Sequence, residues 1–212
     1  FLQESVLGIG GVRMLAALGV NGLTTCHMNE GHAALMTLEL YRSAKEEGIE
    51  DAEEYVRSRC VFTTHTPVAA GHDHFSKDLV ARVLGDAYLM PELSSELYSD
   101  EGLSMTRLGF HFSRHINGVA KKHGEVAREL FPGYRVEFIT NGVHAREWVA
   151  PPLSRLYDAY LPGWQSDPHS LRYVLSIPLS ELWSAHQEAK RALCSFVNTR
   201  YGTHFDEDRF TI

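Results

Sequence analysis

The sequence predicts an α/β fold with a mainly parallel β-sheet. Helical segments and short β-rich segments alternate along the chain, without internal repeats or low-complexity stretches. The chain has 212 residues, of which 44% are hydrophobic and 22% are charged, an ordinary globular composition. A chain of this length buries roughly 70% of its unfolded surface, so we expect a core that needs neither disulfides nor a structural metal.

The first part of the chain is expected to open with a helix over residues 1–19, interrupted by Gly8-Ile9-Gly10-Gly11. The first predicted strand is Leu23–Met28. The second is Cys60–Thr66, which ends before Pro67 because proline cannot donate to a β-ladder. The other elements predicted here are the helices Gly31–Glu47, Asp51–Ser58 and Asp78–Leu84 and the loop Val68–Lys77.

The second part continues this alternation and then changes in texture. The predicted elements are the helix Ser104–His115, the strand Ile116–Ala120, the helix Gly124–Phe131 and the strand Arg135–Thr140. Between Ala150 and Pro178 the chain carries several prolines among short helical pieces, which is typical of a connector between domains. We therefore expect a boundary within residues 141–150, with one domain over residues 1–145 and a different region over 146–212.

A long amphipathic helix is predicted over Leu179–Tyr201, with Gly202 as its stop. The apolar stripe at helical spacing comprises Leu179, Leu182, Trp183, His186, Ala189, Leu193, Phe196, Val197 and Tyr201. We expect this stripe to be core rather than a ligand site, although the following chain is too short to cover it. The chain also opens without a methionine and closes on a β-like run, so we expect an internal fragment with this helix face uncovered.

Charge and composition exclude several classes of protein. There are 20 Lys and Arg against 27 Asp and Glu, a net charge of −7, which argues against nucleic acid or an anionic membrane as the partner. No run of about 18 apolar residues and no basic signal-peptide start is present, so a cytoplasmic location is expected. The three cysteines, Cys26, Cys60 and Cys194, are odd in number and far apart in the sequence, which predicts buried, reduced thiols.

Polar loops follow four of the predicted strands, and these loops are where we expect the chemistry. They are Asn29-Glu30-Gly31-His32, His65-Thr66-Pro67, Lys121-Lys122-His123-Gly124-Glu125 and Asn141-Gly142-Val143-His144. The carboxyl ends of parallel strands face one crevice, where ligands bind. Amide, imidazole, hydroxyl and carboxylate groups are those that read sugar hydroxyls by hydrogen bonds.

Some of these residues also have purely structural interpretations. Asn29 is a candidate helix N-cap, and the helix dipole favours Glu30 in the first turn. His65 is also compatible with a strand-end histidine whose ring is already hydrogen-bonded.

A different hypothesis is a metal-dependent hydrolase that uses His72, His74, Glu30 and His32, because transition metals favour imidazole and carboxylate ligands. His72-Asp73-His74 is weakly specific, and Glu30 and His32 lack the histidine spacing of zincins. Neither a Gly-x-Gly-x-x-Gly nor a Gly-x-Ser-x-Gly motif supports a dinucleotide site or a nucleophile elbow.

Five motifs in register together resemble the α-glucan (glycogen) phosphorylases, especially their short bacterial and archaeal type. They are His27-Met28-Asn29-Glu30-Gly31-His32-Ala33-Ala34, Phe62-Thr63-Thr64-His65-Thr66-Pro67-Val68, Gly71-His72-Asp73, Asn117-Gly118-Val119, and Thr140-Asn141-Gly142-Val143-His144 with Trp148. The resemblance runs in order from Gln3 to Thr211.

This resemblance implies a retaining glycosyltransferase of the GT-B architecture, with two Rossmann-like domains facing across a cleft. It uses inorganic phosphate to release glucose 1-phosphate from an α-1,4-glucan or maltooligosaccharide. Residues 1–145 correspond to the second half of the N-terminal domain, and residues 146–212 to the connector and the start of the C-terminal domain. A homodimer is left open, and so is a passive carbohydrate-binding module as an alternative function.

The resemblance also assigns site residues. His65 matches the catalytic histidine that sits at the glucose 6-hydroxyl and offers its backbone carbonyl to the transition state. Asn141 matches an asparagine at the same hydroxyl, and Glu30, His32 and Val119 match substrate-binding residues. His123 lies in a further motif without a definite role.

The family carries pyridoxal phosphate on a lysine, and no lysine of this chain stands in a matching motif. We therefore expect no cofactor-linking residue and no metal site here, and an inactive chain in isolation.

Overall fold

The computed structural model describes residues 1–20 and 22–211, which form two compact units, Phe1–Asn141 and Gly142–Ile212. The division after Asn141 falls at the start of the predicted boundary region, slightly before the expected change at residue 145. Each unit has its own hydrophobic core.

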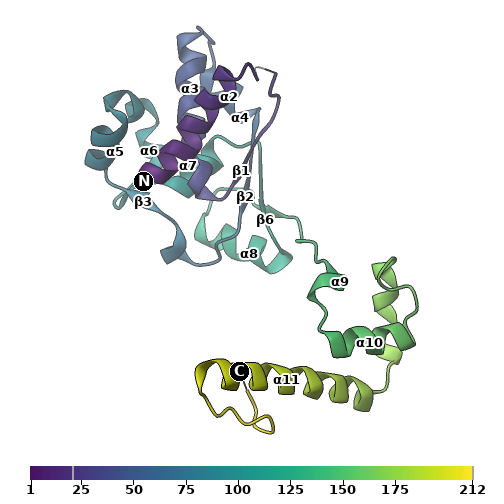
Figure 1. The fold of residues 1–212 in the computed structure, drawn as a ribbon. Coiled ribbons are helices and arrows are strands. Elements are labelled where there is room, and N and C mark those ends of the chain that lie inside the picture. Colours follow the sequence, from purple (N-terminus) through teal and green to yellow (C-terminus); the bar gives the residue numbers. More distant parts are fainter. Residues whose placement is uncertain (21, 212) are drawn as a thin grey trace. The chain divides into compact units, whose positions relative to one another are not determined.

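The first unit is built on a four-stranded parallel sheet in the order β1-β2-β6-β7. The first three of these strands are labelled in Figure 1. Its strands are β1 (Cys26–Asn29), β2 (Cys60–Thr64), β6 (His115–Gly118) and β7 (Glu137–Phe138). The predicted α/β fold is therefore confirmed. The strands are shorter than expected. The strand β2, for example, ends at Thr64, so His65 and Thr66 lie outside its ladder.

Helices cover this sheet and share one core with it. They include α3 (Leu35–Glu46), α4 (Ala52–Arg57), α7 (Met105–His111) and α8 (Lys121–Leu130). A Cβ on Gly109 would lie 2.2 Å from the ring of Phe62, so α7 packs directly on β2. Two predicted helices were too long: Gly31–Ala33 is a 3₁₀ turn, η2, before α3, and α7 ends at His111 because His115 begins β6.

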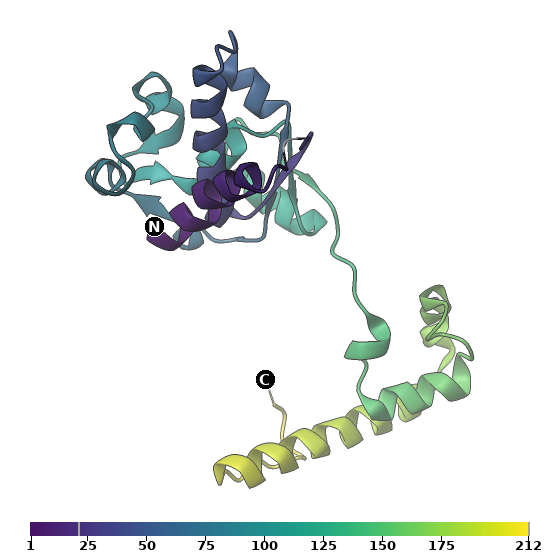
Figure 2. The same cartoon turned by 45° about the horizontal axis from the view of Figure 1, so that its top comes forward.

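The first helical segment is continuous but changes its winding (Figure 2). It consists of α1 (Leu2–Ser5), the π-helical turn η1 (Val6–Gly10) and α2 (Gly11–Ala17), so the predicted interruption is a π-bulge. A Cβ on Gly8 would lie 2.6 Å from the backbone nitrogen of Met36 in α3. Glycine is therefore needed for this close approach.

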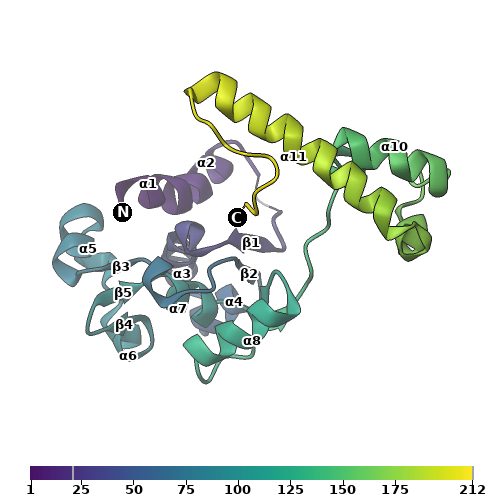
Figure 3. The same ribbon diagram turned by 90° about the horizontal axis from the view of Figure 1, so that it is seen from below.

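A second, antiparallel sheet of the first unit was not predicted. Its order is β3-β5-β4, and it lies beside α5, α6 and α7 (Figure 3). Strands of two or three residues give no alternating pattern that a sequence could reveal. The elements of this region are η3 (Ala69–Gly71), β3 (His74–Phe75), α5 (Lys77–Leu84), η4 (Asp86–Tyr88), η5 (Pro91–Leu93), α6 (Ser94–Leu97), β4 (Tyr98–Ser99) and β5 (Gly102–Ser104).

The second unit is helical, with α9 (Ala145–Trp148), α10 (Pro151–Tyr160), η6 (Pro168–Ser176) and α11 (Leu179–Tyr201). The predicted bounds of α11 are confirmed, and Gly202 ends it in the left-handed conformation, at φ 64°. The expectation that the apolar face of this helix is uncovered is confirmed, because Leu179 is 83% and Trp183 63% exposed. The small core of the unit lies instead around Leu161, Trp164 and Ile177. Among the described residues, no helix is long and apolar enough to cross a membrane.

Candidate active site

Glu30 leaves the carboxyl end of β1, and its carboxylate reaches the loop that follows β2. Its Oε2 accepts hydrogen bonds from the backbone N–H groups of His65 at 2.7 Å and Thr66 at 3.0 Å, and from the Thr66 hydroxyl at 2.9 Å. Its Oε1 accepts from the Gly31 N–H at 3.2 Å, so Glu30, not Asn29, caps the turn η2. Glu30 therefore holds the His65 loop in place.

The backbone of Glu30 adopts a conformation that is rare outside glycine. Its φ is 69° and its ψ is 174°. A non-glycine residue in this region costs about 1–3 kcal/mol and persists only where the surroundings impose it. Here the backbone N–H of Glu30 donates to the Thr63 carbonyl at 2.8 Å, while the carboxylate is held by the next loop. The strain lies at the residue that joins the two strand ends.

His65 and Asn141 are both exposed at this edge of the sheet. The imidazole of His65 makes no hydrogen bond with any residue that the structure describes, so no protein group holds this exposed ring. The backbone N–H of Asn141 donates to the Val119 carbonyl at 3.1 Å, which holds the Asn141 loop beside the end of β6. The four residues thus follow neighbouring strands of one sheet: Glu30 follows β1, His65 follows β2, Val119 follows β6 and Asn141 follows β7.

Polar side chains tie the strand ends together. The Thr63 hydroxyl donates to Asn117 Oδ1 at 3.1 Å and lies 2.8 Å from His27 Nε2, a contact that joins β1, β2 and β6. No role was predicted for Thr63, although it lies in a motif and alternates with the buried residues of β2. His123 is buried, and its Nδ1 accepts from the Val119 N–H at 3.2 Å. His123 therefore positions the Val119 backbone.

His32 occupies a recess of its own. Its Nδ1 lies 3.4 Å from Glu4 Oε1 and 3.7 Å from Asp73 Oδ2. This recess is a cavity of about 450 Å³ with Leu7 and Phe75 in its apolar wall. Burial raises the pKa of the Glu4 carboxyl. Four of the five predicted site residues thus form two neighbouring pairs, Glu30 with His65 and Val119 with Asn141. His32 lies apart from both pairs.

The four predicted metal ligands do not converge. His72 Nδ1 is 2.8 Å from the Thr106 hydroxyl, and burial lowers the pKa of the His72 ring. His74 Nδ1 donates to the His72 carbonyl at 3.0 Å, and the Glu30 carboxylate binds the His65 loop. Over residues 1–20 and 22–211, one group of three potential ligand atoms lies within 4.8 Å, and it shares only His32 with the predicted set. The metal-dependent hydrolase is not supported.

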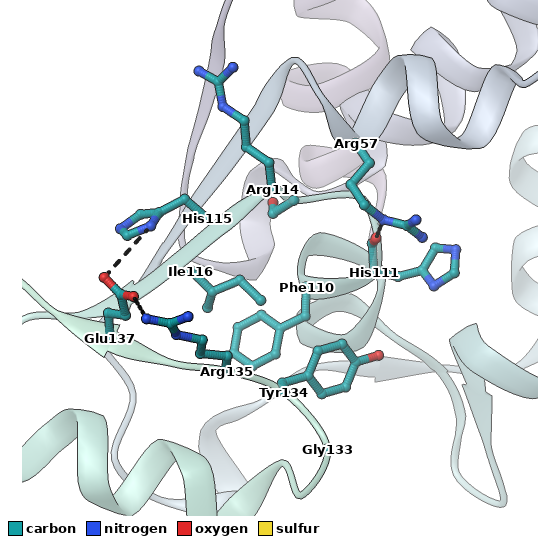
Figure 4. Close-up of a pocket in the computed structure, with 11 residues that line it drawn as sticks. Arg57, Phe110, His111, Arg114, His115, Ile116, Gly133, Tyr134, Arg135 and Glu137 are labelled. Carbon is teal, nitrogen blue, oxygen red and sulfur yellow. Dashed lines mark hydrogen bonds and ion pairs between the residues drawn. The ribbon is translucent and has the colours of Figure 1, made fainter.

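A cavity of about 390 Å³ lies at the amino ends of β6 and β7 (Figure 4). His65 follows the carboxyl end of β2, at the opposite edge of the sheet. Three arginines line the cavity, and each already makes a hydrogen bond or an ion pair with another residue. Arg57 Nε donates to the His111 carbonyl at 2.9 Å, Arg114 to the Ser58 carbonyl at 2.7 Å, and Arg135 pairs with Glu137 at 2.8 Å. Ligands of parallel sheets bind at the carboxyl ends, so this cavity is not the site.

The described residues do not form a pyridoxal phosphate site. Lys45 is bonded to Glu92 at 2.7 Å, Lys122 to Glu125 at 3.2 Å, and Lys77 lies over the Tyr98 ring. Lys121 is exposed at the start of α8, and Lys190 donates to the Arg209 carbonyl in the second unit. None of these amines lies in an enclosed pocket beside His65, so no step of the chemistry is assigned to the cofactor here.

A parallel α/β sheet with this polar edge fits a glycosyltransferase-type enzyme, and comparison with known proteins specifies the family. No protein-family model matches the chain. It is 35% identical to the maltodextrin phosphorylase of Thermococcus litoralis and 33% identical to the glycogen phosphorylase of Mycobacterium tuberculosis, over 93% of this chain and 26% of each relative. The glycogen phosphorylase of Aquifex aeolicus is 28% identical over 93% of this chain and 32% of its own length.

Over most of its length the chain is thus similar to glycogen and maltodextrin phosphorylases, as its motifs indicated, and it is consistent with a fragment of that family. Phosphorylases have the GT-B fold, of which this parallel sheet with its helices is a part. The chain spans about a quarter of the length of the relatives from Thermococcus and Mycobacterium.

Proposed function

We propose that the carboxyl edge of this sheet holds the terminal glucose in an α-glucan phosphorylase. The reaction releases glucose 1-phosphate from an α-1,4-glucan with inorganic phosphate and retains the anomeric configuration. The observation that carries the proposal is the bonding of the His65–Thr66 backbone to Glu30, which sets the matched histidine beside the strand end of Val119 and Asn141. The proposed reaction rests on the similarity to phosphorylases. The proposed position of the glucose rests on the geometry of the loops at the carboxyl edge of the sheet.

The Glu30 contact has a direct electrostatic consequence. In a trans peptide the C=O and N–H groups point in opposite directions. The Thr66 N–H points at Glu30, so the His65 carbonyl points away from that carboxylate. A fixed carbonyl dipole with its negative end free suits a developing oxocarbenium ion. Glu30 is thus a positioning residue, and the His65 carbonyl is the group that faces the reacting sugar.

The remaining matched residues divide the recognition of the sugar. The His65 imidazole and the Asn141 amide supply hydrogen bonds to the glucose 6-hydroxyl, and Val119 supplies an apolar contact. His32, with Glu4 and Asp73, lines the adjoining recess. We assign the first unit to the second half of an N-terminal Rossmann-like domain and the second unit to the connector and the beginning of the next domain. The cofactor and the phosphate-binding groups are contributed by other parts of the enzyme, so the isolated chain is inactive.

The test is phosphate release from glucose 1-phosphate and a maltooligosaccharide primer by a full-length enzyme that contains this sequence, with and without pyridoxal phosphate. His65→Ala and Asn141→Ala each remove a sugar hydrogen bond, a loss of about 1–3 kcal/mol or about 5- to 150-fold in kcat/KM. The control is His115→Ala, at the opposite end of β6.

Release that depends on primer and cofactor, with both site variants impaired and the control active, supports the proposal. Unchanged kinetics in both variants remove these residues from the site. Absence of release from a folded, cofactor-loaded enzyme overturns the phosphorylase reaction itself. Titration of the 212-residue chain with maltooligosaccharide is expected to show very weak binding, and tight binding would favour a passive binding module instead.

A further inference from the structure

Cys26 and Cys60 lie side by side at the amino ends of β1 and β2. They are paired residues in the parallel ladder, and the Cys26 N–H donates to the Arg59 carbonyl at 2.8 Å. Neighbouring strands are about 4.8 Å apart, which is inside the 4.4–6.8 Å range of Cα separations in disulfides. The next paired residues on the same face are Met28 and Phe62, both fully buried. The two thiols therefore project from the same face of the sheet.

The two thiols differ in their surroundings. Cys60 is fully buried, whereas Cys26 is half-buried next to the exposed segment that precedes β1. A hydrogen bond from the Cys60 thiol lowers the pKa of Cys26 to about 7, with a further contribution from the Arg59 guanidinium. The same contact and its burial raise the pKa of Cys60. Cys26 is thus the nucleophile of the pair, in the electropositive and partly accessible setting that makes cysteines reactive.

We propose that Cys26 and Cys60 are a reversible redox pair that a hydroperoxide oxidises to an intrachain disulfide. In the first step the Cys26 thiolate attacks a peroxide oxygen, the O–O bond breaks, and sulfenic acid and hydroxide (or alkoxide) form. In the second step the Cys60 sulfur attacks the sulfenic sulfur, the S–S bond forms, and the Cys60 proton leaves with the hydroxyl as water. The two thiols thus give two electrons to one peroxide as each disulfide forms, and an external dithiol reduces the disulfide back to the two thiols.

The disulfide would join the amino ends of the same two strands that carry Glu30 and His65 at their carboxyl ends. It does not depend on glucan binding or on phosphorolysis. The third cysteine, Cys194, lies buried in α11 of the second unit and serves as an internal control.

The experiment exposes the folded 212-residue chain to hydrogen peroxide at low protein concentration and counts thiols in denaturant, with non-reducing peptide mapping. The three thiols of the chain are expected to fall to one, with a Cys26–Cys60 peptide pair, and dithiothreitol restores all three. Cys194→Ser still loses two thiols. In Cys60→Ser, Cys26 gains oxygen atoms without forming a disulfide. Three thiols that persist, a disulfide that includes Cys194, or a crosslink between chains overturns the proposal.

A second measurement does not require the oxidised state. The pH dependence of alkylation of Cys26 by iodoacetamide is expected to have its midpoint near pH 7. Cys60→Ala removes the hydrogen bond that stabilises the thiolate, so the midpoint moves upward towards that of an ordinary thiol, about 8.5. Far-UV circular dichroism verifies that each variant is folded. A midpoint that Cys60→Ala leaves unchanged shows that the two thiols are not in contact and overturns the pair.

Discussion

Replacement of Glu30 separates two effects that coincide at one residue, the strained backbone and the carboxylate that binds the next loop. Glu30→Ala removes the acceptor of the His65 and Thr66 N–H groups but keeps a Cβ at φ 69°. Hydrogen bonds to a charged group contribute about 1.5–3 kcal/mol each and are not additive. Since this edge is partly open to water, we expect Glu30→Ala to destabilise the first unit by about 3 kcal/mol.

Glu30→Gly loses the same hydrogen bonds but also relieves the backbone strain. Relief of the strain adds about 1–3 kcal/mol to the free energy of unfolding. The more flexible unfolded chain of the glycine variant lowers the free energy of unfolding by about 0.5–1 kcal/mol. Glu30→Gly should therefore be more stable than Glu30→Ala by about 1 kcal/mol. Glu30→Gln is expected to lose only about 1–2 kcal/mol, because one side-chain oxygen accepts all three bonds from His65 and Thr66 and an amide oxygen can replace it.

The assay is thermal unfolding followed by far-UV circular dichroism, combined with hydrogen exchange of the His65 and Thr66 amides. Tryptophan fluorescence is unsuitable as the probe, since Trp148, Trp164 and Trp183 all lie in the second unit. The expected order of stability is wild type, Gln, Gly, Ala, with faster exchange of both amides in Gly and Ala. If Glu30→Ala is at least as stable as Glu30→Gly, the Glu30 backbone is not strained, and if amide exchange is unchanged in both variants, the carboxylate does not hold the His65 loop.

Two further predictions concern the attachment of the first helical segment. Burial raises the pKa of Glu39, but hydrogen bonds from Arg13, Arg42 and the Tyr88 hydroxyl outweigh it and lower the pKa to about 2. The pKa of a glutamate in the unfolded chain is about 4.3, so the lowered pKa contributes about 3 kcal/mol to the free energy of unfolding. This contribution is present above about pH 4.3 and is lost as the pH falls towards 2. In urea unfolding, Glu39→Gln should therefore make the free energy of unfolding less dependent on pH in this acidic range. Gly8→Ala forces a Cβ against α3 and should cost about 2 kcal/mol or more in thermal unfolding, whereas Gly11→Ala, with open space around it, should cost nothing. Equal melting temperatures for the two alanine variants would contradict the packing argument.

The elements that could be predicted from the sequence are those with a local signal. The α11 helix carries a stripe at helical spacing and a glycine stop, and both of its ends were predicted correctly. The segments that contain β1, β2 and β6 each end in a polar loop and alternate with helices, which was sufficient to predict a parallel sheet with polar loops at its carboxyl edge. The motifs that resemble those of phosphorylases lie at those strand ends, so the resemblance could be found without the fold.

The sequence did not reveal contacts between residues far apart in the chain. The hydrogen bond between Glu30 and the His65 backbone joins residues 35 positions apart, and Glu30 has no feature that predicts a positive φ. The Cys26–Cys60 pairing depends on the register of two strands, which neither strand contains alone. The small antiparallel sheet was missed because its strands are too short for a pattern.

The fold class, the bounds of α11, the edge of the sheet where the polar loops gather and the resemblance to phosphorylases could all be obtained from the amino-acid sequence. The three-dimensional packing was needed to find that Glu30 holds the His65 loop, that His123 holds Val119, that His32 belongs to a separate recess and that two cysteines adjoin. Helix periodicity and strand ends follow from neighbouring residues. Which donor meets which acceptor depends instead on how strands and helices pack together.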